Sequence, residues 1–193
     1  MRELVFLLEE ASAKAMLESL LPRILDPQIV PRLIPFEGKQ DLEKQMVKRL
    51  RHYLNPHARF IVMRDQDSHA DCKALKRFLV KQCRDAGKDA VTLVRIACRE
   101  LEAFYLADLA AVEVGLEVRG LVRHQQKAKF RRPDLLGSPS AELEELIKRR
   151  YQKVSGSRQI GQYLDSENVR SDSFRNLISG IRRLEHQLLK IPD

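Results

Sequence analysis

The sequence has few cysteines and no long apolar run. Its three cysteines, Cys72, Cys83 and Cys98, are odd in number, scattered, and without the spacing of metal ligands. They therefore indicate reduced, partly buried thiols. No apolar stretch is long enough to cross a bilayer. The N-terminus lacks the long apolar segment and the small-residue cleavage site of a signal peptide. These absences predict a cytoplasmic protein without a membrane partner.

Low-complexity tracts and internal repeats are also absent. The 193 residues suffice for one domain with a real core, or for a domain with a smaller appendage. The charge is unbalanced, with a formal net charge of +8 and a pI near 9.6. Many cytosolic proteins are basic for no specific reason, but this surplus favours an anionic partner, with nucleic acid first among the candidates.

The positive surplus is concentrated late in the chain. Between Arg123 and Lys153, nine Lys or Arg stand against four Asp or Glu. A compact basic segment around the aromatic Phe130 consists of Lys127, Lys129, Arg131 and Arg132. Contact with a phosphate backbone and a solvated run of charge explain this pattern equally well.

Strand and helix signals alternate along the first hundred residues. Continuous apolar or β-branched runs predict buried strands over residues 4–8, 60–63 and 91–96. An extended stretch over 29–36, broken by Pro31 and Pro35, predicts an edge strand. Helical spacing predicts helices over 17–25, 41–54, 70–86 (ending at Gly87) and 101–112. This alternation predicts an α/β fold with a mostly parallel sheet and helices on both faces.

After about residue 115 the strand signal fades. Ser138 before Pro139 suits the start of a helix over 141–153. Ser171 or Ser173 would cap a last helix. We therefore predict an α/β core over residues 1–115, and a basic helical extension over 116–193 that packs on the core as part of one structural unit.

Acidic residues follow three of the predicted strands. Asp65 and Asp67 come after 60–63, Glu9 comes after 4–8, and Glu100 and Glu102 come after 91–96. Parallel sheets place their sites beyond the carboxyl ends of the strands, so these acids form a candidate cluster. Burying unpaired negative charge costs several kcal/mol. Carboxylates held together are, however, good ligands for a hard cation such as Mg²⁺.

Glu9, Asp65 and Asp67 are the candidate metal ligands, and together with Glu102 they are the candidate catalytic residues. Ions held this way lower the pKa of bound water and neutralise charge on a phosphate. Alternatively, Asp65 caps a loop, Asp67 N-caps the following helix, and Glu102 only complements its own helix dipole. His69 is a general base, a ligand, or a solvated loop histidine.

Several blocks resemble one known family. They are residues 4–9, the Arg-Asp-Gln-Asp-Ser block from Arg64, the Arg-Glu-Leu-Glu-Ala-Phe block from Arg99, the stretch 127–134, and Ser171-x-Ser173-Phe174. Through them nearly the whole chain resembles the Toprim-like domain of unknown function family 4276. The related Toprim folds occur in topoisomerases, primases and the overcoming-lysogenization-defect nucleases.

In those folds, a strand-end glutamate and an Asp-x-Asp pair hold Mg²⁺. The resemblance therefore implies metal-ligand roles for Glu9, Asp65 and Asp67, with Glu102 as an additional ligand. It also implies an ATPase partner in defence against phage.

The chain departs from the family pattern after its first strand. Such proteins read Glu-Gly-x-x-Glu there, whereas this chain has Glu10 for the glycine and Ala13 for the second acid. Neighbouring residues on a strand face opposite sides, so we expect Glu10 to point away from Glu9. The departure predicts a one-metal or weakened site.

The sequence thus predicts a Mg²⁺- or Mn²⁺-dependent nuclease-like protein acting on nucleic-acid phosphodiesters, with Arg64 or the segment 127–132 holding the substrate backbone. Two alternatives stay open. Ala13 is consistent with a non-catalytic interaction subunit of an ATPase that keeps a degenerate acidic site. A phosphatase with Asp65 as nucleophile fits less well, because dehalogenase-type phosphatases carry Asp-x-Asp on the first strand, and Glu9 follows that strand here.

Overall fold

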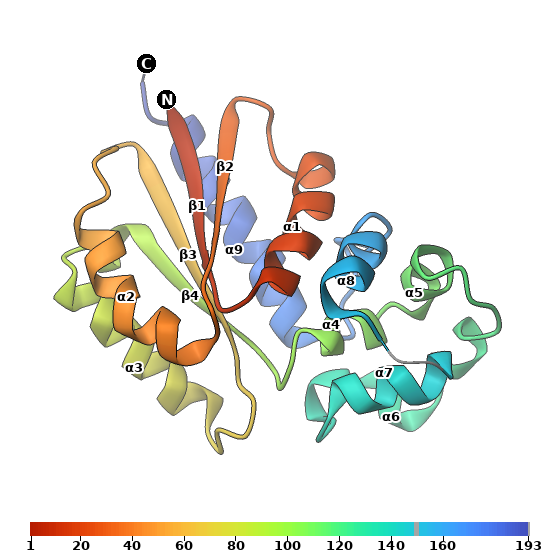
Figure 1. The fold of residues 1–193 in the computed structure, drawn as a ribbon. Helices are drawn as coiled ribbons and strands as arrows, with labels where there is room; N and C mark the ends of the chain where they lie inside the picture. The colour runs from red at the N-terminus through yellow and green to blue at the C-terminus, as the bar shows by residue number, and fades with distance from the viewer. Residues whose placement is uncertain (149–150, 193) are drawn as a thin grey trace.

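A computed structural model describes residues 1–148 and 151–192 as an α/β fold (Figure 1). Its strands are β1 (Arg2–Leu8), β2 (Ile29–Pro35), β3 (Ala58–Asp65) and β4 (Thr92–Ala97). They form one parallel sheet in the order β2-β1-β3-β4. The predicted parallel α/β fold is confirmed, and β2, with its two prolines, lies at an edge as expected.

Long helices cover both faces of the sheet. The helices α2 (Lys39–Arg51) and α3 (Cys72–Asp85) pack on one face, whereas α1 (Ala11–Ile24) and α9 (Asp172–Leu189) pack on the other (Figure 1). Side chains of β1 alternate between the two layers: Val5 and Leu7 meet α2 and α3, and Phe6 meets α1 and α9. This double burial explains the unbroken apolar run of β1.

Shorter helices follow β4 and lie beside the sheet (Figure 1). They are α4 (Glu102–Leu106), α5 (Leu109–Gly115), α6 (Ala128–Arg131), α7 (Pro139–Ile147) and α8 (Lys153–Gly161). Single 3₁₀ turns are η1 (Asp89–Val91), η2 (Val122–His124) and η3 (Pro133–Leu135). A Cβ at Gly161 would lie 2.6 Å from the Met16 carbonyl oxygen, so glycine permits the close approach of α8 to α1.

Two sequence blocks that carry the family resemblance meet at the start of α9. The Ser171 hydroxyl accepts a hydrogen bond from the Phe174 N–H at 3.0 Å and thereby caps the helix, as predicted. Asp134 accepts hydrogen bonds from the Ser171 hydroxyl at 2.6 Å and from the Ser173 N–H at 2.7 Å. The division of the chain at residue 115 stays a prediction, while α9 packs directly on β1, β3 and β4.

Two predicted helices have different bounds in the structure. The helix expected over 41–54 ends at Arg51, and Leu54 is 93% exposed instead of lying on its apolar face. Pro56 disfavours helical backbone at Asn55, so a helix could not continue beyond Leu54. The helix expected over 101–112 is split into α4 and α5, because Asp108 accepts a hydrogen bond from the Ala111 N–H and starts a new helix.

The helix expected over 141–153 is also different. It begins at Pro139, after Ser138 as expected, and ends at Ile147, with Lys148 in the left-handed region at φ 54°. Residues 149–150 of that prediction lie outside the described residues, and Lys153 begins α8. No helix of the described residues is long and apolar enough to span a membrane.

Candidate functional site

The two central strands bring Glu9 and Asp65 together. Leu8 of β1 pairs with Met63 of β3, so both strands end at the same level of the sheet. Glu9 follows β1, and its carboxylate oxygen Oε2 accepts a hydrogen bond from the Asp65 N–H at 3.0 Å. Asp65 is the last residue of β3. These two acids, predicted to share a site, are therefore in direct contact.

Glu102 lies against this pair from the start of α4. The Leu101 N–H donates a hydrogen bond to Asp65 Oδ2 at 3.2 Å, which holds the start of α4 close to β3. The Glu102 side chain is fully buried, and neither of its carboxylate oxygens has a hydrogen-bond partner in the described part of the chain. Unpartnered buried carboxylate oxygens are costly, and they are available to a cation.

The cluster of Glu9, Asp65 and Glu102 resists ionisation. Burial raises the pKa of Glu102 to about 7, partly offset by Lys153, and burial with the nearby Asp67 charge raises the pKa of Glu9 to about 6. Burial, Glu102 and Glu9 together raise the pKa of Asp65 well above its ordinary value. When ionised, each acid thus carries a charge that its surroundings do not fully compensate, which is the condition that favours a bound cation.

Glu10 lies in this cluster, contrary to the prediction that it points away. The strand β1 ends at Leu8, and Glu10 occupies the N-cap position of α1, so the alternation of side chains along a strand does not apply to it. Its charge contributes to raising the pKa of Glu9, Asp65 and Glu102. The Ser12 hydroxyl donates a hydrogen bond to Glu10.

Asp67 stands in a turn beside the cluster. Its backbone is left-handed, with φ 52°, and its N–H donates to the Arg99 carbonyl oxygen at 2.8 Å. The carboxylate oxygen Oδ2 lies 3.0 Å from Lys39 Nζ at the start of α2. The interpretation of Asp67 as the cap of the following helix is wrong, because Asp71 caps α3 by accepting a hydrogen bond from the Lys73 N–H.

His69 lies in the loop between Asp67 and α3. Its side chain is exposed, and its Nδ1 accepts a hydrogen bond from the Asp71 N–H at 3.3 Å. Its own N–H donates to the carbonyl oxygen of Gln66. These contacts are those of a loop histidine.

Two cations contact the cluster. Arg64 is 7% exposed, bonds to Glu43 of α2, and has its Nε 3.7 Å from Glu9 Oε2. Lys153 Nζ lies 3.7 Å from Glu10 Oε1. Burial lowers the pKa of Lys153, but the acids, Glu102 foremost, outweigh this and raise it overall. No local pattern predicts Lys153 at the site, since more than fifty residues separate it from the nearest of these acids.

The basic segment around Phe130 is differently placed. Phe130 is fully buried in the core, so its ring is not available to stack on a base. Lys129 pairs with Glu142 at 2.6 Å and lies over the Phe130 ring, 5.1 Å from its centroid. Lys127, Arg131 and Arg132 are exposed. Glu142 of α7 therefore neutralises part of the positive charge of this segment.

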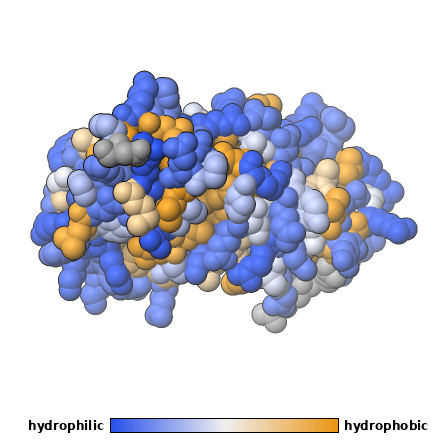
Figure 2. Space-filling model, turned by 90° about the horizontal axis from the view of Figure 1, so that it is seen from above, coloured by the Kyte–Doolittle hydropathy of each residue, from blue (hydrophilic) through white to orange (hydrophobic). Residues whose placement is uncertain are grey.

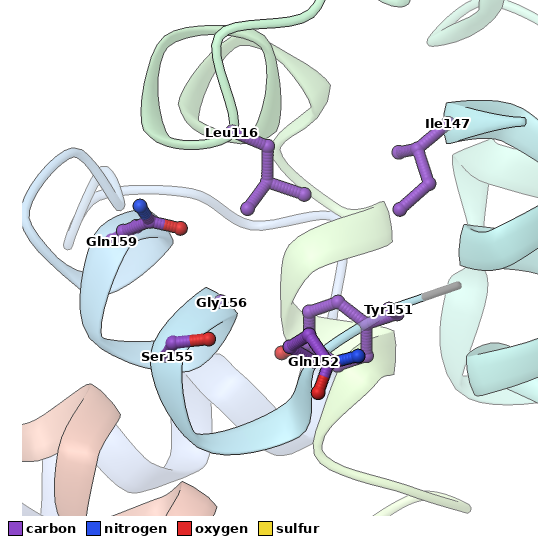
Figure 3. Close-up of a pocket in the computed structure, with 7 residues that line it drawn as sticks. All are labelled: Leu116, Ile147, Tyr151, Gln152, Ser155, Gly156 and Gln159. Atoms are coloured by element: carbon purple, nitrogen blue, oxygen red, sulfur yellow. The ribbon is translucent and has the colours of Figure 1, made fainter. Parts of the chain in front are cut away.

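A cavity of about 340 Å³ lies beside α8 (Figure 3). Its lining residues are Leu116, Ile147, Tyr151, Gln152, Ser155, Gly156 and Gln159. None of them is acidic. The Tyr151 ring packs on Gly156, where a Cβ would lie 2.3 Å from the ring carbon Cε2, and the Tyr151 hydroxyl is 3.0 Å from Ser157 Oγ. This packing fixes the start of α8 and thereby the position of Lys153.

The donor set fits a hard divalent cation. All candidate ligands are carboxylates, which Mg²⁺ and Mn²⁺ prefer over nitrogen or sulfur, and Glu102 contributes two oxygens without a partner. Within residues 1–148 and 151–192, however, no three His, Cys, Asp or Glu side chains are already arranged around a common point suited to a metal ion. Asp67 is instead paired with Lys39, and Glu9 with the Asp65 N–H.

Acids at the carboxyl edge of a parallel sheet, with helices on both faces, define a Toprim-like α/β protein. The chain belongs to the family described as Domain of unknown function (DUF4276), whose model matches residues 8–182. Its fold is similar to that of the C-terminal region of the Burkholderia pseudomallei OLD protein. That match has a TM-score of 0.53 and 16% identity, and covers 95% of this chain and 98% of that chain. No curated protein matches the sequence.

Proposed function

We propose that this protein is a Mg²⁺- or Mn²⁺-dependent hydrolase of nucleic-acid phosphodiesters. The observation that carries the proposal is the cluster of Glu9, Asp65 and Glu102, whose pKa values are all raised and which includes two buried oxygens without partners. Such a cluster lowers folding stability unless a cation compensates its charge. Family membership and the OLD-like fold support the same function.

Glu9, Asp65 and Asp67 would hold the ion, with Glu102 as a further ligand. Lewis-acid stabilisation of charge developing on the phosphate is the chemistry that such an ion supplies when bound. The chain orients its own donors: the Asp65 N–H fixes the Glu9 carboxylate, and the Leu101 N–H fixes that of Asp65. Hydrogen bonds of this kind hold ligands in place and tune their basicity.

The two cations have different parts in this proposal. The Lys153 side chain is 52% exposed at the edge of the cluster, where its ammonium group would contact a substrate phosphate. Arg64 is buried between Glu43 and Glu9, which favours a role in positioning Glu9. Contact of Arg64, or of the segment 127–132, with the substrate stays a prediction.

The test is cleavage of DNA and RNA with Mg²⁺ or Mn²⁺, compared with the same reactions in EDTA. We expect Asp67→Ala and Asp65→Asn to reduce metal-dependent cleavage by at least about a hundredfold, because each removes a charged ligand. Glu145→Gln, an exposed acid of α7, is the matched control. If Asp67→Ala cleaves both substrates as fast as wild type, the assigned mechanism is wrong.

A second candidate function is favoured by the ion pairs of the site. Lys39 binds Asp67 and Lys153 lies beside Glu10, so cations of the chain itself occupy two of the acids. This suits a non-catalytic subunit that docks on an ATPase, as in the phage-defence role that the family resemblance implies. Isothermal titration with Mn²⁺ separates the two candidates, since no binding at millimolar metal would favour the non-catalytic subunit.

A further inference from the structure

One face of α3 carries charge of a single sign. Its five cations are all exposed: Lys73, Lys76, Arg77, Lys81 and Arg84. The helix contains one acid, Asp85. Its opposite face packs in the core through Leu75, Leu79 and Cys83. The positive surplus late in the chain predicted a basic surface there and not on α3, because the cations of α3 are spaced along the helix and do not form a run.

The cations of α3 surround a shallow groove. The groove has a volume of about 490 Å³ and is lined by the five cations and Val80. Arg77 lies 3.6 Å from Asp71, and Arg84 lies 3.7 Å from Asp89, but each of these side chains is at least 45% exposed, so the pairs are weak. Among the described residues, the ammonium groups of Lys73, Lys76 and Lys81 have no hydrogen bond or ion pair.

The neighbouring helix α2 extends this surface. The two helices lie side by side on the face of the sheet away from α9 (Figure 1). Arg51 of α2 donates a hydrogen bond to the Asp85 carbonyl oxygen at 2.7 Å and joins the two helices. Together they contain ten Lys or Arg and three Asp or Glu, a surplus of seven, against +8 for the whole chain. We call their exposed cations the α2–α3 basic surface: Lys39, Lys44, Lys48, Arg49, Arg51, Lys73, Lys76, Arg77, Lys81 and Arg84.

This surface begins at the acidic cluster. The helix α3 starts directly after the loop that carries Asp67, and Lys39, the first residue of α2, contacts Asp67. A strand lying along α3 would therefore have one end at the acids. The surroundings of the basic segment 127–132 have no such surplus of positive charge. Residues 127–147 contain four Lys or Arg and four Asp or Glu.

The apolar face of α3 argues against a membrane surface as the occupant. Amphipathic helices bind membranes through a free apolar face, and that of α3 is buried against the sheet, apart from the single side chain of Phe78, which is 45% exposed. At the end of the molecule where the strands begin, the visible apolar residues gather near the middle, with hydrophilic residues around them (Figure 2). A row of unpaired ammonium groups along an exposed helix suits a line of phosphates.

We infer that the α2–α3 basic surface binds the phosphate backbone of a nucleic-acid strand and leads it to the acidic cluster. The inference rests on the proposed function, since it assigns the substrate of that site to a surface. The 14 residues of α3 extend over about 21 Å. That length matches about six nucleotides at roughly 3.4 Å each.

The test measures binding without cleavage. Fluorescence anisotropy of labelled 20-nucleotide DNA and RNA in EDTA compares wild type with Lys76→Glu/Lys81→Glu, and with Arg131→Glu/Arg132→Glu, the same change of charge on the competing segment 127–132. We expect the first variant to raise Kd by roughly tenfold or more, and the second to change it less than about threefold, which would exclude that segment as the main contact. The salt slope of log Kd should fall by about 1.5 in the first variant only.

The milder variant Lys76→Gln/Lys81→Gln, with circular dichroism of each protein, guards against loss of folding. Equal weakening in the α3 and 131–132 variants, weakening only in the latter, or no binding by wild type would each overturn the inference. Binding of polyglutamate to wild type in place of nucleic acid would overturn it too, in favour of an acidic protein partner. If wild type binds through α3 but never cleaves with Mn²⁺, the inference stands and the proposed catalytic function fails.

Discussion

The acidic cluster makes the stability of the metal-free protein depend on pH. Glu9 and Glu102 have pKa values raised from 4.5 to about 6 and about 7. The folded state therefore binds more protons than the unfolded state between these values. A raised carboxyl pKa lowers stability as pH rises from the unfolded pKa to the folded one. We expect the free energy of unfolding in EDTA to decrease from pH 5 to pH 8.

The size of the decrease follows from the two pKa values. A tenfold change in proton affinity corresponds to about 1.4 kcal/mol, and part of each change falls below pH 5. Between pH 5 and pH 8, Glu102 therefore accounts for about 2–3 kcal/mol and Glu9 for about 1 kcal/mol. The two acids share Asp65 as a neighbour and do not act independently, so their sum is an upper bound. The total change is thus between about 2 and about 4 kcal/mol, a large share of the stability of a single domain.

The assay is urea unfolding in EDTA at pH 5, 6.5 and 8. Glu102→Gln removes the buried charge but keeps the shape, so it should unfold like wild type at pH 5 and be more stable than wild type by about 2–3 kcal/mol at pH 8. Glu145→Gln, exposed on α7, should follow the wild-type curve. A wild-type stability that is flat from pH 5 to 8, or an equally steep decline in Glu102→Gln, would refute the electrostatic reasoning.

Three further changes test the contacts around the site. Lys153→Gln removes a cation beside Glu10, so calorimetry should show tighter Mn²⁺ binding while cleavage becomes about tenfold slower or more. Gly156→Ala places a methyl group against the Tyr151 ring and should cost about 1–3 kcal/mol in urea unfolding; unchanged stability would show that the ring moves freely. Asp134→Ala removes both hydrogen bonds to the start of α9 and should cost about 1–3 kcal/mol in the same assay.

The sheet could be predicted from the sequence because its residues are buried on both faces. Runs such as Leu4–Leu8 have no other explanation in a chain without a membrane-spanning helix among its described residues. The alternation of strands and helices predicts a parallel sheet, in which Glu9 and Asp65 lie at the same edge. In the structure the two residues are in contact. The apolar runs and helical spacings that predict these strands and helices involve residues close together in the sequence, so this part of the fold could be predicted from local patterns.

The sequence could not show which cations meet the acids. Lys153 reaches Glu10 only because α8 packs closely on α1, which depends on Gly161 and on the Tyr151–Gly156 contact. The contact of Gly161 with Met16 joins segments more than a hundred residues apart, and no local pattern encodes it. The cations of α2 and α3 likewise form one surface only because both helices pack on the same face of the sheet, which neither helix shows by itself.

Ala13 stands where the family has a second acid, and the structure shows another carboxylate nearby. Ala13 is 5% exposed in the core of the α1 layer, and Glu10 precedes it by three residues at the N-cap of α1. Glu10 acts on Glu9, Asp65 and Glu102 by raising the pKa of each. We therefore expect Glu10 to supply the carboxylate that is missing at position 13, and Glu10→Gln to weaken Mn²⁺ binding in calorimetry.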